Sequence, residues 1–221
     1  MSDRVLVEFS NVDLSYRRGG GILRNFSLTI RAGEAVVITG GPGSGKTSVA
    51  ELLVGTKFSD SGSVEVFDEI LRSGRRRALN RVRRKIGGVG GIFGLVPSYT
   101  VAENITFPLV IAGMRKRTRK ERLLKMLTEF SLLKKAGDYP HTLTRVEQTL
   151  VQLARASIAD QPLLVIDEPM AGLDQATAAR VFEYLVQASF SGRTMLLLVS
   201  DRPAGEIPNS IYHEIKQGTL E

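Results

Sequence analysis

The sequence contains no cysteine among its 221 residues. Without thiol groups the chain can form neither a disulfide framework nor a thiolate metal site, and this absence is compatible with a cytosolic location. Histidine is almost absent too, since the chain has only His141 and His213. We expect both to be surface or packing residues rather than parts of a functional site.

Long apolar runs are also missing. No window approaches the roughly 18 apolar residues that a transmembrane helix needs, and the opening Met1-Ser2-Asp3-Arg4 does not begin a signal segment. The hydrophobic content of 43% and the charged content of 24% are ordinary for a soluble globular protein. The length allows one large α/β domain, or one core with a small subdomain.

The net charge of +7 comes mostly from two basic runs, at residues 75–85 and 115–120. Such runs could face nucleic acid or an anionic membrane surface. Neither run is interleaved with aromatic residues in the way that a nucleic-acid platform requires. The favoured interpretation is a solvated helix face, and nucleic acid is not expected as a partner.

The clearest motif is the glycine-rich segment Gly40-Gly41-Pro42-Gly43-Ser44-Gly45-Lys46-Thr47, which has the form G-x-x-x-x-G-K-[ST]. Residues 35–39 predict a buried strand before it and residues 48–55, from Ser48 on, a helix after it. Glycines let backbone N–H groups approach phosphate oxygens, and the helix directs its positive end at the same anion. We expect Lys46 to reach the β- and γ-phosphates and Thr47 to ligate Mg²⁺. The segment with Ser48 therefore predicts a nucleoside triphosphate site.

A second candidate lies at residues 163–169, where an apolar run ends in Asp167, Glu168 and a proline. A continuous apolar run is typical of a buried parallel strand, and open α/β sheets bind ligands at the carboxyl ends of such strands. We expect Asp167 to hold Mg²⁺, directly or through water. Glu168 is then the candidate catalytic residue, placed to polarise the attacking water.

The remaining segments are predicted to be further strands and helices. Residues 4–16 predict either a strand pair or one bent strand, and further strands are expected at 22–30, 63–67, 194–199 and 210–215. Helices are expected at 72–85, 100–113, 118–135, 143–159 and 175–189. We predict one domain over residues 1–221, in which 1–95 and 159–221 form the core and about 96–158 form an inserted helical subdomain.

Over essentially its whole length the chain resembles the ATP-binding subunit of ABC transporters, and most of all the branch that serves lipoprotein release, macrolide export and cell division. Besides the two motifs above, Tyr16 falls where that family has its adenine-stacking aromatic. By itself a tyrosine in this position is more often a core or edge residue than a base-stacking one. The segment Ala171-Gly172-Leu173-Asp174 resembles the loop through which one subunit contacts the site of the other.

This resemblance implies an α/β fold, namely a P-loop NTPase core with a mixed sheet, an antiparallel β subdomain and the inserted helical subdomain. It implies ATP and Mg²⁺ as cofactors. The implied partners are an integral membrane permease subunit and a second ATP-binding subunit, as a homodimer or a heterodimer. The implied location is peripheral, on the cytoplasmic face of the membrane. Residues 107–111 could line the surface that docks the membrane subunit, or they could belong to the core of the helical subdomain.

Three places depart from the family pattern. The family signature, Leu-Ser-Gly-Gly-Gln, is replaced by Leu143-Thr144-Arg145-Val146-Glu147-Gln148. Thr144 and Arg145 are then, with Asp174, the candidate dimer contacts. The family glutamine expected near Gly90 or Gly91 is missing, and no glutamine lies between residues 49 and 147. The residues 200–202, Ser-Asp-Arg, stand where the family has a histidine that contacts the γ-phosphate.

Two hypotheses for the activity therefore stay open. In the first, the chain is the ATP-binding subunit of a membrane transport or lipoprotein-handling complex, and it couples Mg-ATP binding and slow hydrolysis to dimerisation. In the second, it is a regulatory or scaffold subunit with little or no hydrolysis, paired with an intact ATPase. A third, an ABC-type protein that acts on nucleic acid or ribosomes, is disfavoured because the chain is compact and has no duplicated halves.

Overall fold

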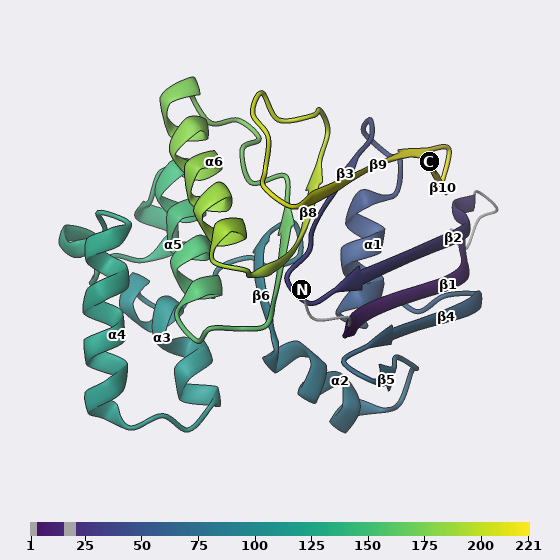
Figure 1. Ribbon diagram of the computed structural model, residues 1–221. Helices are drawn as coiled ribbons and strands as arrows, with labels where there is room; N and C mark the ends of the chain where they lie inside the picture. The colour runs from purple at the N-terminus through teal and green to yellow at the C-terminus, as the bar shows by residue number, and fades with distance from the viewer. Residues whose placement is uncertain (1–3, 16–20) are drawn as a thin grey trace.

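The computed structural model describes residues 4–15 and 21–221, which form two sheets and six α-helices (Figure 1). The larger sheet has the strand order β10-β9-β3-β8-β7-β6, and the smaller sheet has the order β2-β1-β4-β5. The larger sheet is mixed and the smaller one is wholly antiparallel. This architecture agrees with the α/β fold class expected from the sequence.

The larger sheet positions the candidate site. Its strands are β3 (Ala35–Thr39), β6 (Ile86–Gly90), β7 (Leu163–Asp167), β8 (Thr194–Val199), β9 (Ser210–Lys216) and β10 (Thr219–Leu220). The strands β9, β3, β8, β7 and β6 run parallel to one another, and β10 is antiparallel to β9. The strands β3, β7 and β8 are almost fully buried, because their side chains are apolar on both faces. The segments that follow β3, β6, β7 and β8 therefore meet along one edge of the sheet.

The smaller sheet consists of β1 (Val5–Ser15), β2 (Gly21–Arg31), β4 (Ser61–Val66) and β5 (Glu69–Ile70). The first stretch of the chain is one bent strand and not a strand pair. Its register against β2 shifts between Phe9 and Val12, and Asn11 at the shift has a φ of 48°. Such an irregularity bends a strand without ending it. The two-residue strand β5 was not predicted.

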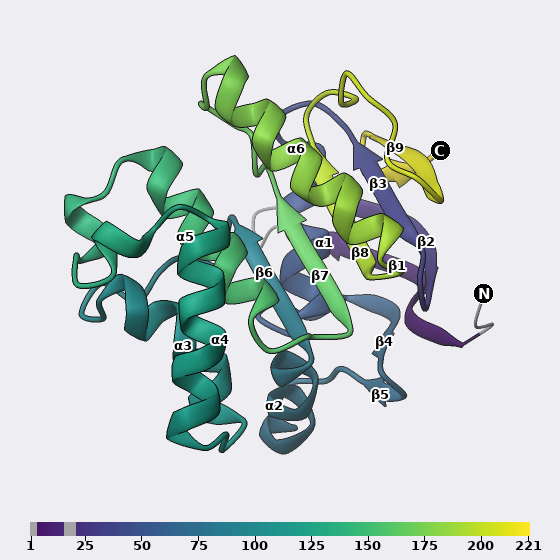
Figure 2. The ribbon, with the colours of Figure 1, turned by 60° about the vertical axis from the view of Figure 1, so that its left-hand side comes forward.

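Two hydrophobic cores lie on opposite faces of the larger sheet. Alternate residues of β3 point to opposite sides, so that Val36 and Ile38 join the core under α1 (Lys46–Leu53) and the smaller sheet. Val37 joins the core formed with α5 (Arg145–Ser157) and α6 (Gln175–Phe190). Figure 2 shows α6 crossing in front of this sheet.

Beside β6 lies a helical block, defined here as α3 (Val101–Ile111), α4 (Lys116–Glu129) and α5 (Figure 1). The prediction of one helix over 118–135 was wrong at its end. The helix α4 stops at Glu129, Ser131 has a φ of 59°, and a separate 3₁₀ turn covers Leu133–Lys135. A second 3₁₀ turn covers Pro140–Thr142. The division of the chain into a core and a helical subdomain stays a prediction.

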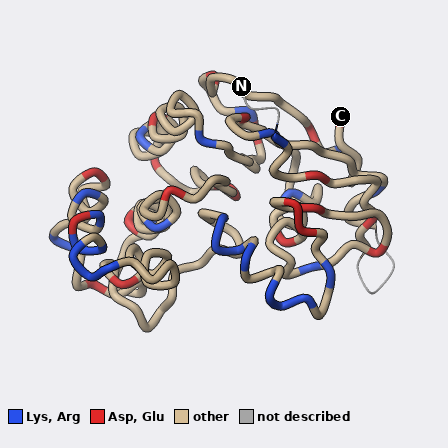
Figure 3. The backbone as a smooth tube through the Cα atoms, turned by 60° about the horizontal axis from the view of Figure 1, so that its bottom comes forward, with Lys and Arg blue, Asp and Glu red and all other residues tan. Residues whose placement is uncertain are grey.

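Both basic runs lie on exposed helix surface (Figure 3). The first run forms α2 (Arg76–Arg84), which buries Ala78, Leu79 and Val82 and exposes its arginines. This helix begins four residues later than predicted, because Gly74 in the preceding turn has a φ of 83°. The second run begins α4, with its charged side chains mostly exposed. These placements fit the interpretation of the runs as solvated helix faces.

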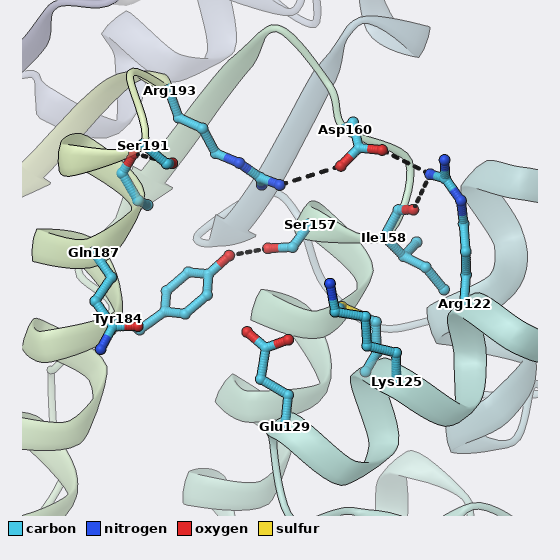
Figure 4. A pocket seen from close by; sticks show the side chains of 12 residues that line it. Arg122, Lys125, Glu129, Ser157, Ile158, Asp160, Tyr184, Gln187, Ser191 and Arg193 are labelled. Carbon is cyan, nitrogen blue, oxygen red and sulfur yellow. Dashed lines mark hydrogen bonds and ion pairs between the residues drawn. The ribbon is translucent and has the colours of Figure 1, made fainter.

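A polar pocket of about 360 Å³ separates α4 from α6 and is shown in Figure 4. The Asp160 carboxylate accepts hydrogen bonds from Arg122 of α4, at 2.7 Å, and from Arg193 before β8, at 3.3 Å. Arg122 also donates to the carbonyl oxygen of Ile158, at 2.9 Å. These contacts attach the far side of the helical block to the core.

Candidate nucleotide-binding site

The predicted phosphate-binding loop connects β3 to α1. Two of its glycines, Gly43 and Gly45, have φ values of 77° and 109°. A Cβ atom on Gly45 would lie 3.0 Å from the carbonyl oxygen of Ile22 and 2.9 Å from the Leu23 side chain, so only glycine fits there. Because Gly45 is also the N-cap residue of α1, no cap side chain covers the first N–H groups of the helix. Those N–H groups can therefore bind an anion.

Lys46 lies inside this loop. Its side chain is 6% exposed, and its ammonium group donates hydrogen bonds to the carbonyl oxygens of Gly40, at 2.5 Å, and Gly41, at 3.2 Å. The same nitrogen is 3.5 Å from Glu168 Oε1. A cation held among carbonyl oxygens can exchange them for phosphate oxygens with little movement of its backbone.

Asp167 is the most deeply buried carboxylate of the site, at 2% exposure. Its Oδ2 atom accepts a hydrogen bond from the Thr47 hydroxyl at 3.0 Å. Its Oδ1 atom is buried and has no hydrogen-bond partner among the described residues. Burial raises the pKa of Asp167 above its ordinary value, the neighbouring Glu168 charge raises it further, and the Thr47 hydrogen bond partly opposes both effects.

The Asp167 carboxylate and the Thr47 hydroxyl fit a Mg²⁺ site. A buried carboxylate oxygen without a partner costs free energy unless a cation or a donor meets it. Thr47 and Asp167 supply the oxygen ligands that Mg²⁺ prefers, and this ion commonly takes one or two protein ligands beside water and substrate phosphates. The described residues contain no cluster of three acidic, histidine or cysteine side chains that could bind a metal alone.

Glu168 follows β7 in a strained backbone conformation, with a φ of 50°. Its N–H group donates to the carbonyl oxygen of Leu198, at 2.8 Å, so the turn is anchored to β8. Its carboxylate accepts a hydrogen bond from the Ser200 hydroxyl, at 2.5 Å, and faces Lys46. Non-glycine residues rarely adopt this conformation, and such strain is concentrated at functional sites. The catalytic role of Glu168 stays a prediction.

The contact between Ser200 and Glu168 was not foreseen. The sequence marked residues 200–202 only as the place where a histidine is missing. In the structure Ser200 is the first residue after β8, next to the carboxyl end of β7, and its hydroxyl donates a hydrogen bond to Glu168. Arg202 turns away to lie over the ring of Tyr212, with 4.1 Å from its guanidinium carbon to the ring centroid, and Asp201 is exposed.

The predicted dimer contacts have partners within the chain. Thr144 caps α5 by a reciprocal pair of hydrogen bonds with Glu147, and Asp174 caps α6 by accepting from the Thr177 N–H at 3.1 Å. The Arg145 guanidinium lies against Gly172, since an added Cβ there would be 3.4 Å from its Nη1 atom. Contact of these residues with a second subunit stays a prediction.

Two other candidates have different outcomes. Tyr16 lies outside the described residues, so its predicted stacking on adenine stays a prediction. The apolar run at 107–111 is partly buried and partly exposed, and its role in docking a membrane subunit stays a prediction. Leu109 is fully buried in the core of the helical block, whereas Val110 and Ile111 are 48% and 41% exposed.

The larger sheet is mostly parallel. A glycine-rich loop with a lysine follows one of its strands, and a carboxylate at the end of another strand faces that loop. This arrangement defines a P-loop nucleotide-binding protein. Comparison with known proteins identifies the group within that class. The family model described as ABC transporter matches residues 23–171. The chain belongs to the ABC transporter family, as its motifs predicted.

Relatives and solved structures agree with this assignment. The chain is 30% identical to the cell division ATP-binding protein FtsE of Bacillus subtilis, over 95% of the chain and 91% of that protein. It is 32% identical to the macrolide export ATP-binding/permease protein MacB of Campylobacter jejuni, over 90% of the chain, but it spans only 31% of that relative. The dimeric structure of MJ0796, a bacterial ABC transporter cassette, superposes with a TM-score of 0.87 at 27% identity, over 98% of this chain and 97% of the other. The predicted fold class is thereby confirmed.

Proposed function

We propose that the chain is the ATP-binding subunit of an ABC-type transport, lipoprotein-handling or cell-division complex, and that it binds Mg-ATP between the phosphate-binding loop and Asp167. The observation that carries this proposal is the pairing of Thr47 with a buried Asp167 whose second oxygen has no partner, directly beside a lysine-containing loop. The family membership and the relatives named for ATP binding support it.

Each residue of the site has a defined task in this proposal. The glycine backbone, Ser44 and the first turn of α1 with Ser48 bind the phosphates, and Lys46 exchanges its carbonyl partners for the β- and γ-phosphate oxygens. Thr47 and Asp167 hold Mg²⁺, which neutralises phosphate charge when it is bound. Glu168, oriented by Ser200 and Lys46, accepts the proton of the attacking water.

Pairing with a second ATP-binding subunit, as a homodimer or a heterodimer, is part of the proposal. Its support is the likeness to a cassette whose structure is dimeric. An integral membrane permease is the second proposed partner, because a permease is part of the name of one relative and methionine import part of the name of another. No helix among the described residues is long and apolar enough to cross a membrane. We propose a peripheral position on the cytoplasmic face.

The test is ATP binding and turnover with Mg²⁺ on the purified chain, beside Lys46→Ala, Glu168→Gln and the control Lys134→Ala. Lys134 is an exposed lysine of the 3₁₀ turn that follows α4. We expect Lys46→Ala to lose ATP binding. The wild-type chain should hydrolyse ATP at less than about 1 s⁻¹. Glu168→Gln should lose this turnover and still bind ATP. Binding that is the same in Lys46→Ala and Lys134→Ala would refute the proposal. Binding without any turnover would favour the regulatory subunit over the slow ATPase.

A further inference from the structure

The turn after β6 lies directly against Asp167. Gly90 pairs with Asp167 in the sheet, and both Gly90 and Gly91 have positive φ values, 73° and 43°. A Cβ atom on Gly90 would overlap the carbonyl oxygen of Asp167, and one on Gly91 would overlap its Oδ2 atom. The backbone of this turn therefore forms one wall around the carboxylate that is proposed to hold Mg²⁺.

The helix α5 fastens this turn at two points. The Gln152 Oε1 atom accepts a hydrogen bond from the Gly90 N–H at 2.6 Å. One turn further along the helix, the Arg155 guanidinium donates to the carbonyl oxygens of Phe93 and Gly94, the latter at 2.9 Å. Burial lowers the pKa of Arg155 from its ordinary value, as expected for a cation enclosed by backbone.

Strand and helix are also in close backbone contact below the turn. A Cβ atom on Gly87 would overlap the carbonyl oxygen of Ala156, so β6 and α5 approach each other more closely than any side chain allows. The helix, the strand and the turn are thus packed directly against one another. Since Thr144 caps α5 and Arg145 begins it, two of the candidate dimer contacts lie on the helix that holds the wall beside Asp167.

The hydrogen bond from the Gly90 N–H to Gln152 satisfies a backbone donor at the edge of the larger sheet. As β6 is the last strand, a Gly90 N–H group directed away from β7 has no strand to pair with. The Gly90 carbonyl points the same way and accepts from the Phe93 N–H at 2.8 Å. The Nε2 atom of Gln152 has no hydrogen bond within the described part of the chain, and the residue lines a pocket of about 520 Å³ together with Asp167 and Glu168.

We propose that Gln152 is a positioning residue of the Mg-nucleotide site, supplied by α5 where the segment after β6 has no glutamine. Its side-chain oxygen fixes the Gly90–Gly91 turn, and the turn fixes the Asp167 carboxylate in the geometry that accepts Mg²⁺. The inference rests on the proposed function. This role of Gln152 explains how the nucleotide site is connected to α5, although Gly90 and Gly91 leave no room for side chains of their own.

The test measures the turn and the metal separately. Gln152→Met keeps the length of the side chain and removes the acceptor, whereas Gln152→Glu keeps an acceptor oxygen. Thr149→Ala is the matched control, because Thr149 lines the same pocket but bonds only to Arg145 O of its own helix. Amide hydrogen exchange is followed in peptides covering residues 87–95 of the nucleotide-free protein, and ATP affinity is measured with Mg²⁺ and with EDTA.

We expect Gln152→Met to speed exchange at the turn about fivefold and to weaken ATP binding with Mg²⁺ about fivefold, the effect of one lost hydrogen bond. ATP affinity in EDTA stays unchanged, Gln152→Glu retains slow exchange, and Thr149→Ala matches the wild type in both assays. Unchanged exchange in Gln152→Met overturns the anchoring role. Faster exchange with unchanged Mg-ATP affinity overturns the positioning role. A wild-type chain without Mg-dependent ATP binding refutes the proposed function itself, while the exchange data still report on the anchor.

Discussion

Placing a glutamine at Gly91, one of the two positions near which the family glutamine is expected, offers a direct test of the turn. The sequence comparison alone suggests that Gly91→Gln would repair the site. The structure predicts the opposite result, because any Cβ atom at this position overlaps Asp167 Oδ2 and lies 3.1 Å from its Cγ atom. The backbone also has a φ of 43°, which disfavours residues other than glycine.

The expected cost follows from these two effects. A side chain in the left-handed region costs about 1–2 kcal/mol, and relief of the overlap costs about 1–3 kcal/mol, as in overpacked cores. The free energy of unfolding should therefore fall by about 2–5 kcal/mol, and Tm by about 4–20 °C for a chain of this size. Mg-dependent ATP affinity should fall as well, since Asp167 is displaced.

Thermal and urea unfolding of the nucleotide-free protein measure this cost. Gly94→Gln is the control, because an added Cβ there has no atom within 4 Å and the φ is ordinary, so stability should change by about 0.5 kcal/mol or less. The reasoning is refuted if Gly91→Gln is as stable as Gly94→Gln. It is also refuted if Gly91→Gln increases ATP turnover.

Two further predictions concern carboxylates with opposite surroundings. Asp167→Asn should raise the urea midpoint at pH 7, because burial raises the folded-state pKa and the charged form is disfavoured in the fold. In the wild type, the free energy of unfolding falls as the pH rises above the unfolded pKa of about 3.8, because Asp167 must then carry its charge in the fold. The stability advantage of Asp167→Asn should therefore shrink toward acid pH. The Mg-ATP affinity of the variant should fall about tenfold or more. Asp160→Asn should cost less than about 1 kcal/mol in urea unfolding, because its ion pairs involve a side chain that is 64% exposed. Asp160→Ala should cost about 1 kcal/mol more, because asparagine tolerates the φ of 52° and alanine does not.

The sequence predicted those parts of the site that depend on local pattern. The strands at 35–39, 163–167 and 194–199 were located because unbroken apolar runs bounded by polar residues are fully buried. The phosphate-binding loop was located because glycine spacing and a following lysine determine its shape. The bent first strand was left open, since alternation along a chain does not show where a bulge shifts the register.

The contacts that connect these parts could not be predicted. Gln152 and Gly90 are 62 residues apart, and Ser200 and Glu168 are 32 apart. Neither pair belongs to a motif, and each depends on the close approach of elements that only the folded sheet brings together. The unpartnered oxygen of Asp167 is likewise a property of packing. The glycines at 87–94 did signal unusual backbone, but the sequence did not show that Gly87 lies against α5 and that Gly90 and Gly91 lie against Asp167.

The three departures from the family pattern meet at one place. Gly91 and Arg145 line the same pocket as Asp167 and Glu168, and Ser200 is hydrogen-bonded to Glu168. The glycine at residue 91 forms part of a turn that α5 holds through Gln152 and Arg155, and Arg145 at the start of α5 brings a positive charge to the pocket that holds two carboxylates. We therefore expect the three predicted departures to act as one rearranged site and not as three independent losses. A single reversion leaves the other two changes in place, so hydrolysis at the rate of an intact cassette would require the turn, the start of α5 and the segment after β8 to change together.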